Sequence, residues 1–379
     1  MRKMIPYGRQ NIDDEDIAAV VRVLRSPLIT QGPVVEEFES RVAQYCGAEY
    51  AVAFNSGTSA LHAAMYAAGI KPGDEVISTP LTFVATANAA VYMGAIPVFV
   101  DIDPDTFCID TSRIEEAITP QTRAIVPVDY AGYPVDMDMI KAIAKRHDLI
   151  VVEDAAHALG AIREDVPVGK DADMTMFSFH PVKHITTGEG GMILCNEERY
   201  WRQLCSCRSH GIERQAVNWE YDDEGPWYYE MQELGYNFRM TEIQSALGIS
   251  QFKKLPNFIE QRREIAARYD AALLDIPWLN LAPQPALVYK HAYHLYPILL
   301  DRDIDRKDFF CYMRAHDIGV QVHYIPVHLQ PYYQRNFAYG RGDFPVAEEI
   351  YAREVSLPIY PGLTEPDQAY VIQTLKDFK

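Results

Sequence analysis

Residues 177–191, with the sequence FSFHPVKHITTGEGG, place one lysine between an apolar run and a glycine-rich turn. The apolar run predicts a buried strand, and Lys183 follows a few residues after it. An amine becomes a nucleophile near neutral pH only where desolvation or a neighbouring positive charge lowers its pKa. A lysine just beyond a buried strand can meet that condition, so Lys183 is a candidate for an imine bond with a carbonyl compound. Taken alone, the pattern fits a surface lysine after a buried strand better.

An apolar run that ends in an acid lies upstream, in residues 149–157, LIVVEDAAH. Such runs are typical of strands buried on both faces of a parallel sheet, and residues just past their carboxyl ends face the usual ligand crevice. Asp154 is therefore predicted to lie at a binding site, although a helix N-cap is the competing interpretation. A carboxylate there would keep the pyridine nitrogen of pyridoxal phosphate protonated, so that the ring can accept electrons from a substrate carbanion.

A phosphate site is predicted in residues 52–65, VAFNSGTSALHAAM, which fit a strand, a turn of small residues and a helix. Backbone N–H groups and the positive end of the helix dipole favour an anion at such a turn. Ser56 and Thr58 add hydroxyl donors, and Gly57 lets the backbone come close to a ligand. The turn also fits simple helix capping, so its weight comes from its agreement with Lys183 and Asp154.

Seven short apolar runs separated by helical patterns predict an α/β fold, with a mostly parallel seven-stranded sheet flanked by helices. The runs lie near 51–54, 75–78, 96–100, 124–128, 150–153, 174–178 and 191–195. A helical stretch from 240 to 254 is expected to be interrupted at Leu255-Pro256, where we place a domain boundary. Residues 1–254 would then form an N-terminal arm and a large pyridoxal-phosphate-binding domain, and residues 255–379 a smaller α+β C-terminal domain.

Composition argues against several classes of protein. The chain has 379 residues, 48% of them hydrophobic, and a formal net charge of -18. Because polyanions need a basic face, this charge argues against a general binder of nucleic acid or of membrane surfaces. No apolar stretch approaches the roughly 20 residues of a membrane span, and the first residues do not resemble a signal peptide. We therefore expect a cytoplasmic protein with reduced cysteines and no metal site.

A long segment between Cys207 and Gly235 departs from the alternating pattern and is rich in acids and aromatic residues, including Trp219, Tyr221 and Trp227. Loops of this length in a compact enzyme are usually functional, and the aromatic content disfavours simple disorder. We expect the segment to cover an active site or to cross a subunit boundary.

Several further motifs occur along the chain. They are NSGTSAL at 55–61, TFVATAN at 82–88, EDAAH at 153–157, the Lys183 segment, RSHG at 208–211, GYNFRM at 235–240, VHYIP at 322–326 and SLP at 356–358. In this order they resemble the DegT–StrS family of nucleotide-sugar aminotransferases, which are fold type I pyridoxal phosphate enzymes, over essentially the whole chain. HPVKHITTGEGG at 180–191 and HALG at 157–160 are most similar to the members that act in the pseudaminic acid pathway.

The resemblance implies a role for each site residue. Lys183 would hold pyridoxal phosphate as a Schiff base and would act as general base and acid during proton transfer. The other cofactor-binding residues would be Ser56, Gly57, Thr58, Phe83, Asp154, His157, Ser178 and Asn237. Asn237 would reach the phosphate of the neighbouring subunit, which implies a homodimer with an active site shared across the interface. Substrate contacts would come from Tyr7, Thr30, His180, His323 and Tyr324.

The implied reaction moves an amino group from L-glutamate to C4 of a UDP-4-keto-6-deoxy-N-acetylhexosamine. Open alternatives are another 4-keto or 3-keto nucleotide sugar and, from a different class, a catalytically silent sensor that binds the cofactor. A related 3-dehydratase fits less well, because those relatives carry histidine where this chain has Lys183. The sequence leaves open the sugar and its configuration, the amino donor, and assembly beyond a dimer. Arg208, Arg214 and Lys254 are unranked candidates for binding the diphosphate.

Overall fold

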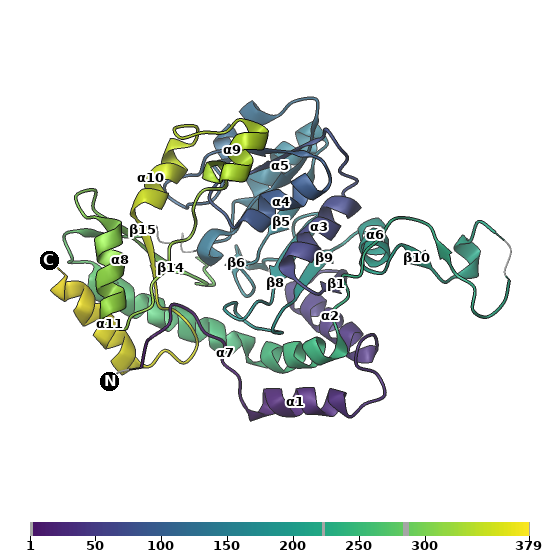
Figure 1. Ribbon diagram of the computed structural model, residues 1–379, viewed down its shortest axis with the longest axis horizontal. Coiled ribbons are helices and arrows are strands. Elements are labelled where there is room, and N and C mark those ends of the chain that lie inside the picture. Colours follow the sequence, from purple (N-terminus) through teal and green to yellow (C-terminus); the bar gives the residue numbers. More distant parts are fainter. Residues whose placement is uncertain (1–2, 222–223, 283–287, 379) are drawn as a thin grey trace.

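The computed structural model describes residues 3–221, 224–282 and 288–378, and a seven-stranded sheet forms its centre (Figure 1). The strand order is β1-β9-β8-β5-β4-β2-β3. The strands are β1 (Tyr50–Phe54), β2 (Glu75–Ser78), β3 (Ile96–Phe99), β4 (Thr122–Val126), β5 (Ile150–Asp154), β8 (Met174–Ser178) and β9 (Gly191–Cys195). In this sheet β9 alone runs in the direction opposite to the other six strands. The predicted fold class, with its mostly parallel sheet, is confirmed.

Helices cover both faces of the sheet, because successive residues of a strand point to opposite sides. On β1, Val52 and Phe54 pack in one core cluster, whereas Ala51 and Ala53 pack in another. The first cluster includes residues of α3 (Gly57–Ala67), α4 (Val84–Tyr92) and α6 (Glu198–Arg208). The second includes residues of α2 (Pro33–Cys46) and α7 (Glu242–Leu273). A third cluster buries α5 (Met137–His147) against the middle strands.

The predicted interruption at Leu255-Pro256 is wrong, because α7 continues from Glu242 to Leu273 with Pro256 inside it. A proline inside a helix removes one backbone hydrogen bond and crowds the preceding turn. Pro256 lies on the exposed face of α7, whereas Leu255 and Ile259 are buried in the core. Tertiary packing therefore holds the helix together at this point. The predicted domain boundary falls inside α7, and a division of the chain there stays a prediction.

The C-terminal part has the expected α+β composition. An antiparallel sheet of β12 (Leu279–Leu281), β14 (Tyr296–Leu300) and β15 (Glu354–Leu357) packs with α8 (Arg306–Ala315) and α11 (Glu365–Asp377). Ile5 belongs to the same core, so the N-terminal segment lies against this part of the chain. Two helices that lie between α8 and α11 in the sequence, α9 (Pro331–Phe337) and α10 (Pro345–Arg353), pack instead with the cluster that includes α5 (Figure 1).

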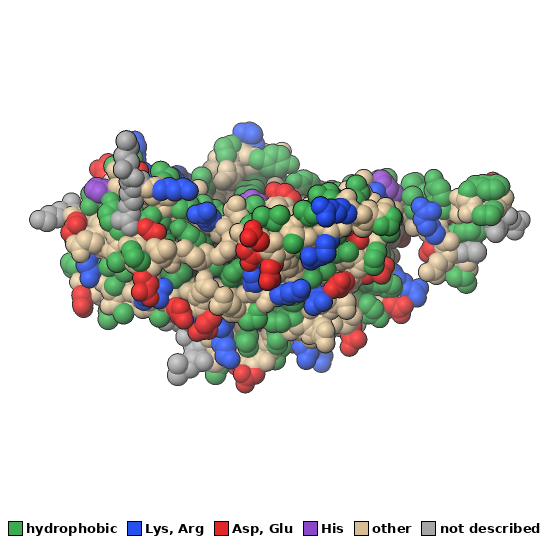
Figure 2. Space-filling view, turned by 90° about the horizontal axis from the view of Figure 1, so that it is seen from below, with side chains coloured by type: hydrophobic (Ala, Val, Ile, Leu, Met, Phe, Trp, Pro, Cys, Tyr) green, Lys and Arg blue, Asp and Glu red, His purple; other side chains and the backbone are tan. Residues whose placement is uncertain are grey.

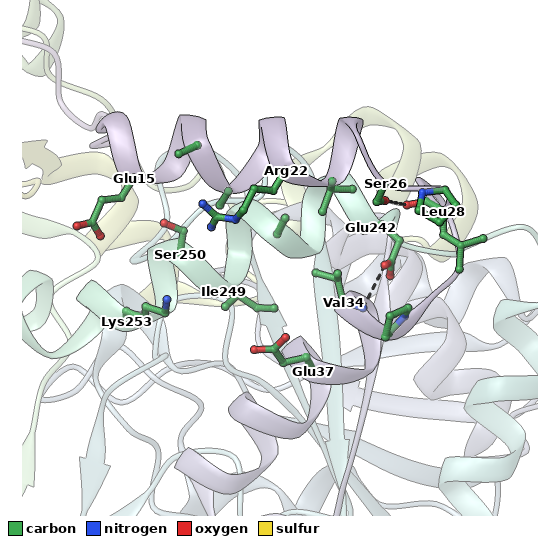
Figure 3. Close-up of a pocket in the computed structure, with 16 residues that line it drawn as sticks. Glu15, Arg22, Ser26, Leu28, Val34, Glu37, Glu242, Ile249, Ser250 and Lys253 are labelled. Carbon is green, nitrogen blue, oxygen red and sulfur yellow. Dashed lines mark hydrogen bonds between the residues drawn. The ribbon is translucent and has the colours of Figure 1, made fainter.

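Helix α1 (Asp14–Leu24) lies along α7, where Lys254 Nζ is 2.6 Å from Asp16 Oδ2. A cavity of about 540 Å³ lies between α1, the start of α2 and α7 (Figure 3). Glu242 closes one end of it, since its carboxylate accepts the backbone N–H groups of Val34 and Val35 at 3.1 and 2.8 Å. This carboxylate satisfies donors at the first turn of α2 that have no partner within the helix.

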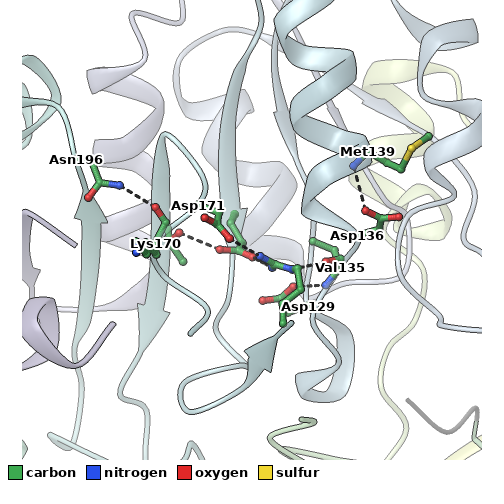
Figure 4. Close-up of polar contacts among 10 residues, drawn as sticks. Asp129, Val135, Asp136, Met139, Lys170, Asp171 and Asn196 are labelled. Carbon is green, nitrogen blue, oxygen red and sulfur yellow. Dashed lines mark hydrogen bonds and ion pairs between the residues drawn. The ribbon is translucent and has the colours of Figure 1, made fainter. Parts of the chain in front are cut away.

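A buried ion pair supports β5 on the side away from α3. Arg163 Nη2 lies 2.8 Å from Glu153 Oε1, and the two side chains are 5% and 0% exposed. Arg163 Nε also donates to the carbonyl of Val135 at 2.7 Å, and its Nη1 lies 3.4 Å from Asp171 Oδ2. Figure 4 shows Val135 and Asp171 together with Asp129, which accepts the N–H of Val135. Arg163 belongs to a small antiparallel sheet of β13 (Tyr289–Lys290), β6 (Ile162–Arg163) and β7 (Val166–Pro167). The pair fixes the strand that ends at Asp154.

The segment after α6 forms an arm that projects away from the sheet (Figure 1). Its base is an antiparallel pair of β10 (Ile212–Glu213) and β11 (Glu230–Met231). Tyr221 and Trp227 on the arm are 74% and 71% exposed. Large exposed apolar side chains gathered in one place are typical of a contact surface.

The face in Figure 2 carries acidic and basic side chains interspersed. Among the described residues, we find no helix with the length and apolar character needed to span a bilayer.

Candidate active site

A cavity of about 580 Å³ lies at the carboxyl ends of β5 and β8, beside the first turn of α3. Cavities of this size accommodate cofactors and small substrates. The structure brings most of the predicted site residues to this cavity. They are Tyr7, Ser56, Gly57, Thr58, Phe83, Asp154, His157, Ser178, His180, Lys183, His323 and Tyr324.

Thr30 and Asn237 are not among the lining residues. Thr30 is exposed and its carbonyl accepts the N–H of Glu242 at the start of α7. Asn237 is exposed, and its carbonyl accepts from the side chain of Asn55 at 3.4 Å. Its predicted contact with a neighbouring subunit stays a prediction. None of the described residues of the arm lines the cavity, so the arm does not cover the site of its own chain.

Lys183 lies in the connection from β8 to β9, which backbone hydrogen bonds hold in place. The Lys183 N–H donates to the carbonyl of His180 at 2.9 Å, and the Phe179 N–H donates to the carbonyl of Gly190 at 2.9 Å. Burial lowers the pKa of Lys183 to about 7; the Asp154 carboxylate opposes this effect and the positive charge of Arg262 adds to it. A large fraction of the amine is therefore uncharged and nucleophilic near neutral pH.

Asp154 is a buried carboxylate at the end of β5. Its Oδ2 accepts from Thr86 Oγ1 at 2.6 Å, and its Oδ1 accepts from the N–H of Ala156 at 3.2 Å. Burial raises the pKa of Asp154, while these two hydrogen bonds and the charge of Lys183 lower it. A cation placed against this carboxylate would stabilise its charged form.

The turn before α3 packs closely against β9 and the end of β8. Ser56 caps the helix, since its Oγ accepts the N–H of Ser59 at 3.1 Å. A Cβ on Gly191 would lie 2.6 Å from the carbonyl oxygen of Ser56, so only glycine fits where β9 passes this turn. Gly57 and Ser178 also lie against each other, because a Cβ on Gly57 would be 3.2 Å from that of Ser178. Backbone N–H groups and hydroxyl donors therefore meet at a helix N-terminus.

Neutral histidines form one wall of the cavity. His157 Nε2 is 3.0 Å from the hydroxyl of Tyr324, and the rings of His157 and His294 are 4.3 Å apart between centroids. Burial lowers the pKa of both histidines far below the ordinary value, so they are uncharged at neutral pH. Within the described part of the chain, Nδ1 of each is buried without a hydrogen-bond partner.

These residues fit pyridoxal phosphate. Asp154 suits the ring nitrogen, Lys183 suits the aldehyde, and the turn at Ser56 suits the phosphate. Phe83 is 56% exposed although it is aromatic, and it lines the cavity, where its face can stack on a flat ring. The unpartnered Nδ1 atom of His157 is a polar group that a bound ligand can satisfy.

The sequence did not identify two residues that act in this geometry. Thr86, which donates to Asp154, lies one helical turn after Thr82, and their hydroxyl oxygens are 2.8 Å apart. The i, i+4 spacing within TFVATAN is a signal that could have found it. His294 Nε2 is 3.5 Å from Lys183 Nζ, and His294 lies in the segment just before β14, which begins at Tyr296. No local pattern marks His294 as a site residue.

The comparison with known proteins agrees with this geometry. The model of the DegT/DnrJ/EryC1/StrS aminotransferase family matches residues 10–376. The chain belongs to this family. The chain is similar to the spore coat polysaccharide biosynthesis protein SpsC of Bacillus subtilis. The two are 42% identical, and the match covers 98% of this chain and 96% of SpsC.

Solved structures extend the agreement to three dimensions. Helicobacter pylori PseC, an aminotransferase involved in the biosynthesis of pseudoaminic acid, is 35% identical with a TM-score of 0.92, covering 99% of this chain and 98% of PseC. The PLP form of Spr1654 from Streptococcus pneumoniae, named as a sugar aminotransferase, is 30% identical with a TM-score of 0.91, covering 98% of each chain. This DegT/DnrJ/EryC1/StrS member is a sugar aminotransferase that uses pyridoxal phosphate, as predicted.

Proposed function

We propose that this enzyme transfers an amino group from L-glutamate to C4 of a UDP-4-keto-6-deoxy-N-acetylhexosamine, on a route to pseudaminic acid. The observation that carries the proposal is the similarity to PseC over the whole chain, at 35% identity and a TM-score of 0.92. The segment around Lys183, which carries the closer sequence resemblance, contributes His180 and Lys183 to the cavity.

In this proposal each residue of the cavity has a separate role in binding the cofactor. Pyridoxal phosphate, when bound, supplies an electron sink for the carbon that loses its proton. Asp154, supported by Thr86, holds a positive charge at the ring nitrogen, and Ser56, Gly57, Thr58 and Ser178 bind the phosphate. Phe83 would stack on the ring, and His157 would lie near its edge.

Lys183 is both the attachment point and the proton carrier. Its pKa of about 7 allows the amine to accept a proton and to return it at the same pH. Among the described residues that line the cavity, Lys183 is the only lysine or arginine. This supports its assignment as the group that moves the proton.

Tyr7, His180, His323 and Tyr324 are proposed to contact the sugar. The ring of Tyr7 is 5.5 Å from that of His323 between centroids. The backbone N–H of His323 donates to Glu354 Oε2 at 2.7 Å. Its ring Nδ1 is 2.9 Å from Ser356 Oγ, and this contact holds the imidazole in one orientation. Fixed polar groups of this kind determine which hydroxyl or amide groups of a ligand are accepted.

We also infer that the functional unit is a homodimer, with Asn237 of one subunit at the phosphate of the other. The exposed aromatic arm, which projects from its own chain, supports this inference.

Thr30 belongs to the proposed substrate contacts on the same basis as Tyr7, by family resemblance. The cytoplasmic location stays a prediction.

Another keto nucleotide sugar is the second candidate substrate. The identity to SpsC, at 42%, exceeds that to PseC, at 35%, and SpsC is named for spore coat polysaccharide biosynthesis. A different sugar would change the groups that Tyr7, His180 and His323 must recognise, and would leave the cofactor residues unchanged.

Incubation with a panel of UDP-, dTDP- and GDP-linked 4-keto and 3-keto sugars tests the proposal. With L-glutamate as donor, mass spectrometry should show amination of the UDP-4-keto-6-deoxy-N-acetylhexosamine, and Lys183→Ala should abolish it. Turnover of a different sugar alone would replace our proposal with the second candidate. A panel of amino donors and sedimentation analysis test glutamate and the homodimer separately.

A further inference from the structure

Arg262 of α7 is a fully buried arginine, with 0% of its surface exposed. Its Nη1 donates to the carbonyls of Tyr293, His294 and Ile359 at 3.0, 3.3 and 3.1 Å. Its Nη2 donates to the carbonyl of Val182 at 3.5 Å. All four acceptors are backbone carbonyls, which carry partial charges only.

This guanidinium has no acidic partner in the described part of the chain, and its Nε has no hydrogen-bond partner. Arg163 shows the usual arrangement, with Glu153 at 2.8 Å. A buried charge without a counter-charge is costly, because desolvation is not offset by an ion pair. Burial accordingly lowers the pKa of Arg262 to about 9. A structural arginine would be more stable with a carboxylate beside it.

The four carbonyls belong to the segments that build the wall around Lys183. Val182 directly precedes Lys183, and His294 Nε2 lies 3.5 Å from Lys183 Nζ. Ile359 donates its N–H to the carbonyl of Tyr7 at 3.0 Å, so it lies beside the N-terminal segment of the cavity. We propose that Arg262 is a positioning residue for Lys183, which ties these segments together and places an unpaired positive charge near the amine.

The charged groups around Lys183 determine how Arg262 affects the pKa of its amine. The described groups that interact electrostatically with the amine are Asp154 on β5, Arg262 on α7, and four histidines, which are His157, His184, His294 and His323. Tyr7, His180, Glu189 and Tyr324 also line the cavity. Burial lowers the pKa of all four histidines, that of His323 to about 3, so they are uncharged at neutral pH. Of these six groups, Asp154 and Arg262 remain charged, and they act in opposite directions on the pKa of Lys183. Arg262 therefore offsets the carboxylate that the cofactor requires.

The test compares Arg262→Gln, which removes the charge, with Arg262→Lys, which keeps the charge but cannot reach all four carbonyls. Arg263→Gln is the matched control, because Arg263 is the next residue of α7 and also donates to carbonyls, those of His291 at 3.1 Å and Gly160 at 3.4 Å. The first readout is the rate at which Lys183 of the full-length, cofactor-free protein reacts with acetic anhydride across a pH series, measured by peptide mass spectrometry. The second is the pH titration of the visible absorption of the enzyme with bound pyridoxal phosphate.

We expect a labelling midpoint near pH 7 for the wild type, and a rise on the order of one unit in Arg262→Gln. The absorption midpoint should move in the same direction. Arg262→Lys should keep the wild-type midpoint but lose about 10- to 100-fold in kcat, because Lys183 is less well placed. Arg263→Gln should leave the midpoint unchanged.

A folded Arg262→Gln protein with the wild-type midpoint would overturn the proposal, as would an equal shift in Arg263→Gln. If Arg262→Gln does not fold, Arg262→Lys decides the question. An unchanged midpoint with reduced kcat then supports the proposal, and a raised midpoint or wild-type kcat refutes it. The labelling and absorption midpoints do not depend on the choice of sugar substrate, and kcat is measured with whichever sugar the wild type accepts.

Discussion

Replacing Thr86 with valine should weaken the binding of pyridoxal phosphate, because it removes the hydroxyl that donates to Asp154. The Oγ1 to Oδ2 distance is 2.6 Å, and both side chains are buried. A hydrogen bond to a charged group contributes about 1.5–3 kcal/mol, and one pKa unit corresponds to about 1.4 kcal/mol. Burial already raises the pKa of Asp154, and the substitution should raise it further, because the Thr86 hydrogen bond lowers it.

The sign of the pH effect follows from the charge that the cofactor needs. Asp154 must be ionised to pair with the protonated ring nitrogen, so the affinity falls as the pH drops through the pKa of Asp154. In Thr86→Val this fall should begin at a higher pH than in the wild type. Where the wild-type carboxylate is ionised and the hydrogen bond is fully formed, its loss should raise the Kd by about 10- to 100-fold.

Titration of the visible absorption with pyridoxal phosphate, repeated over a pH series, measures both effects. Thr86→Ser keeps the donor and should bind almost as the wild type does. Thr82→Val removes a hydroxyl that is 2.8 Å from Thr86 Oγ1 but leaves the bond to Asp154, so its effect should be smaller. The reasoning fails if Thr86→Val binds with wild-type affinity at every pH, or if Thr86→Ser is as impaired as Thr86→Val.

Three further predictions concern stability and the phosphate turn. Arg163→Met should lower the free energy of unfolding by about 3–5 kcal/mol, since it leaves Glu153 buried without its cation. Arg146→Met, in an exposed pair, should have a much smaller effect, and equal losses in urea unfolding would contradict this. Gly191→Ala should raise the Kd for pyridoxal phosphate at least about tenfold, because the new Cβ would lie 2.6 Å from a carbonyl of the turn, and Gly340→Ala, in open space, should not. The urea midpoint should fall steeply below pH 6.5, because unfolding releases buried neutral histidines that then bind protons, each adding a slope of up to about 1.4 kcal/mol per pH unit; a flat profile down to pH 5 would refute it.

The central sheet could be predicted from the sequence because its strands are buried on both faces. Each of the seven appears as a short apolar run, and the predicted and observed strands differ by only a few residues at their ends. The predicted helix interruption at Pro256 was wrong because a local rule was applied where distant contacts decide the structure. The rule that proline ends a helix is local, whereas the buried neighbours Leu255 and Ile259 hold α7 together through contacts with distant residues.

The candidate site could be predicted in part for the same reason. Asp154 and Ser178 end neighbouring parallel strands, so their convergence with Lys183 follows from the sheet itself. His294 and Arg262 could not be found this way. Their contacts with the Lys183 segment join residues that are far apart in the sequence, and they depend on how the C-terminal part packs against the sheet. No local pattern encodes such a contact.

The charges of the cavity also bear on how a nucleotide sugar binds. A diphosphate requires cations, yet Lys183 is the only lysine or arginine among the described lining residues, and we assign it to the cofactor. The unranked candidates are placed elsewhere: Arg208 pairs with Glu39 at 2.6 Å, Lys254 pairs with Asp16, and Arg214 lies on the arm over the ring of Tyr229. Because the arm leaves its own cavity uncovered, the cations for the diphosphate are expected from a second copy of the chain. Dilution to monomers should then weaken nucleotide-sugar binding more than cofactor binding.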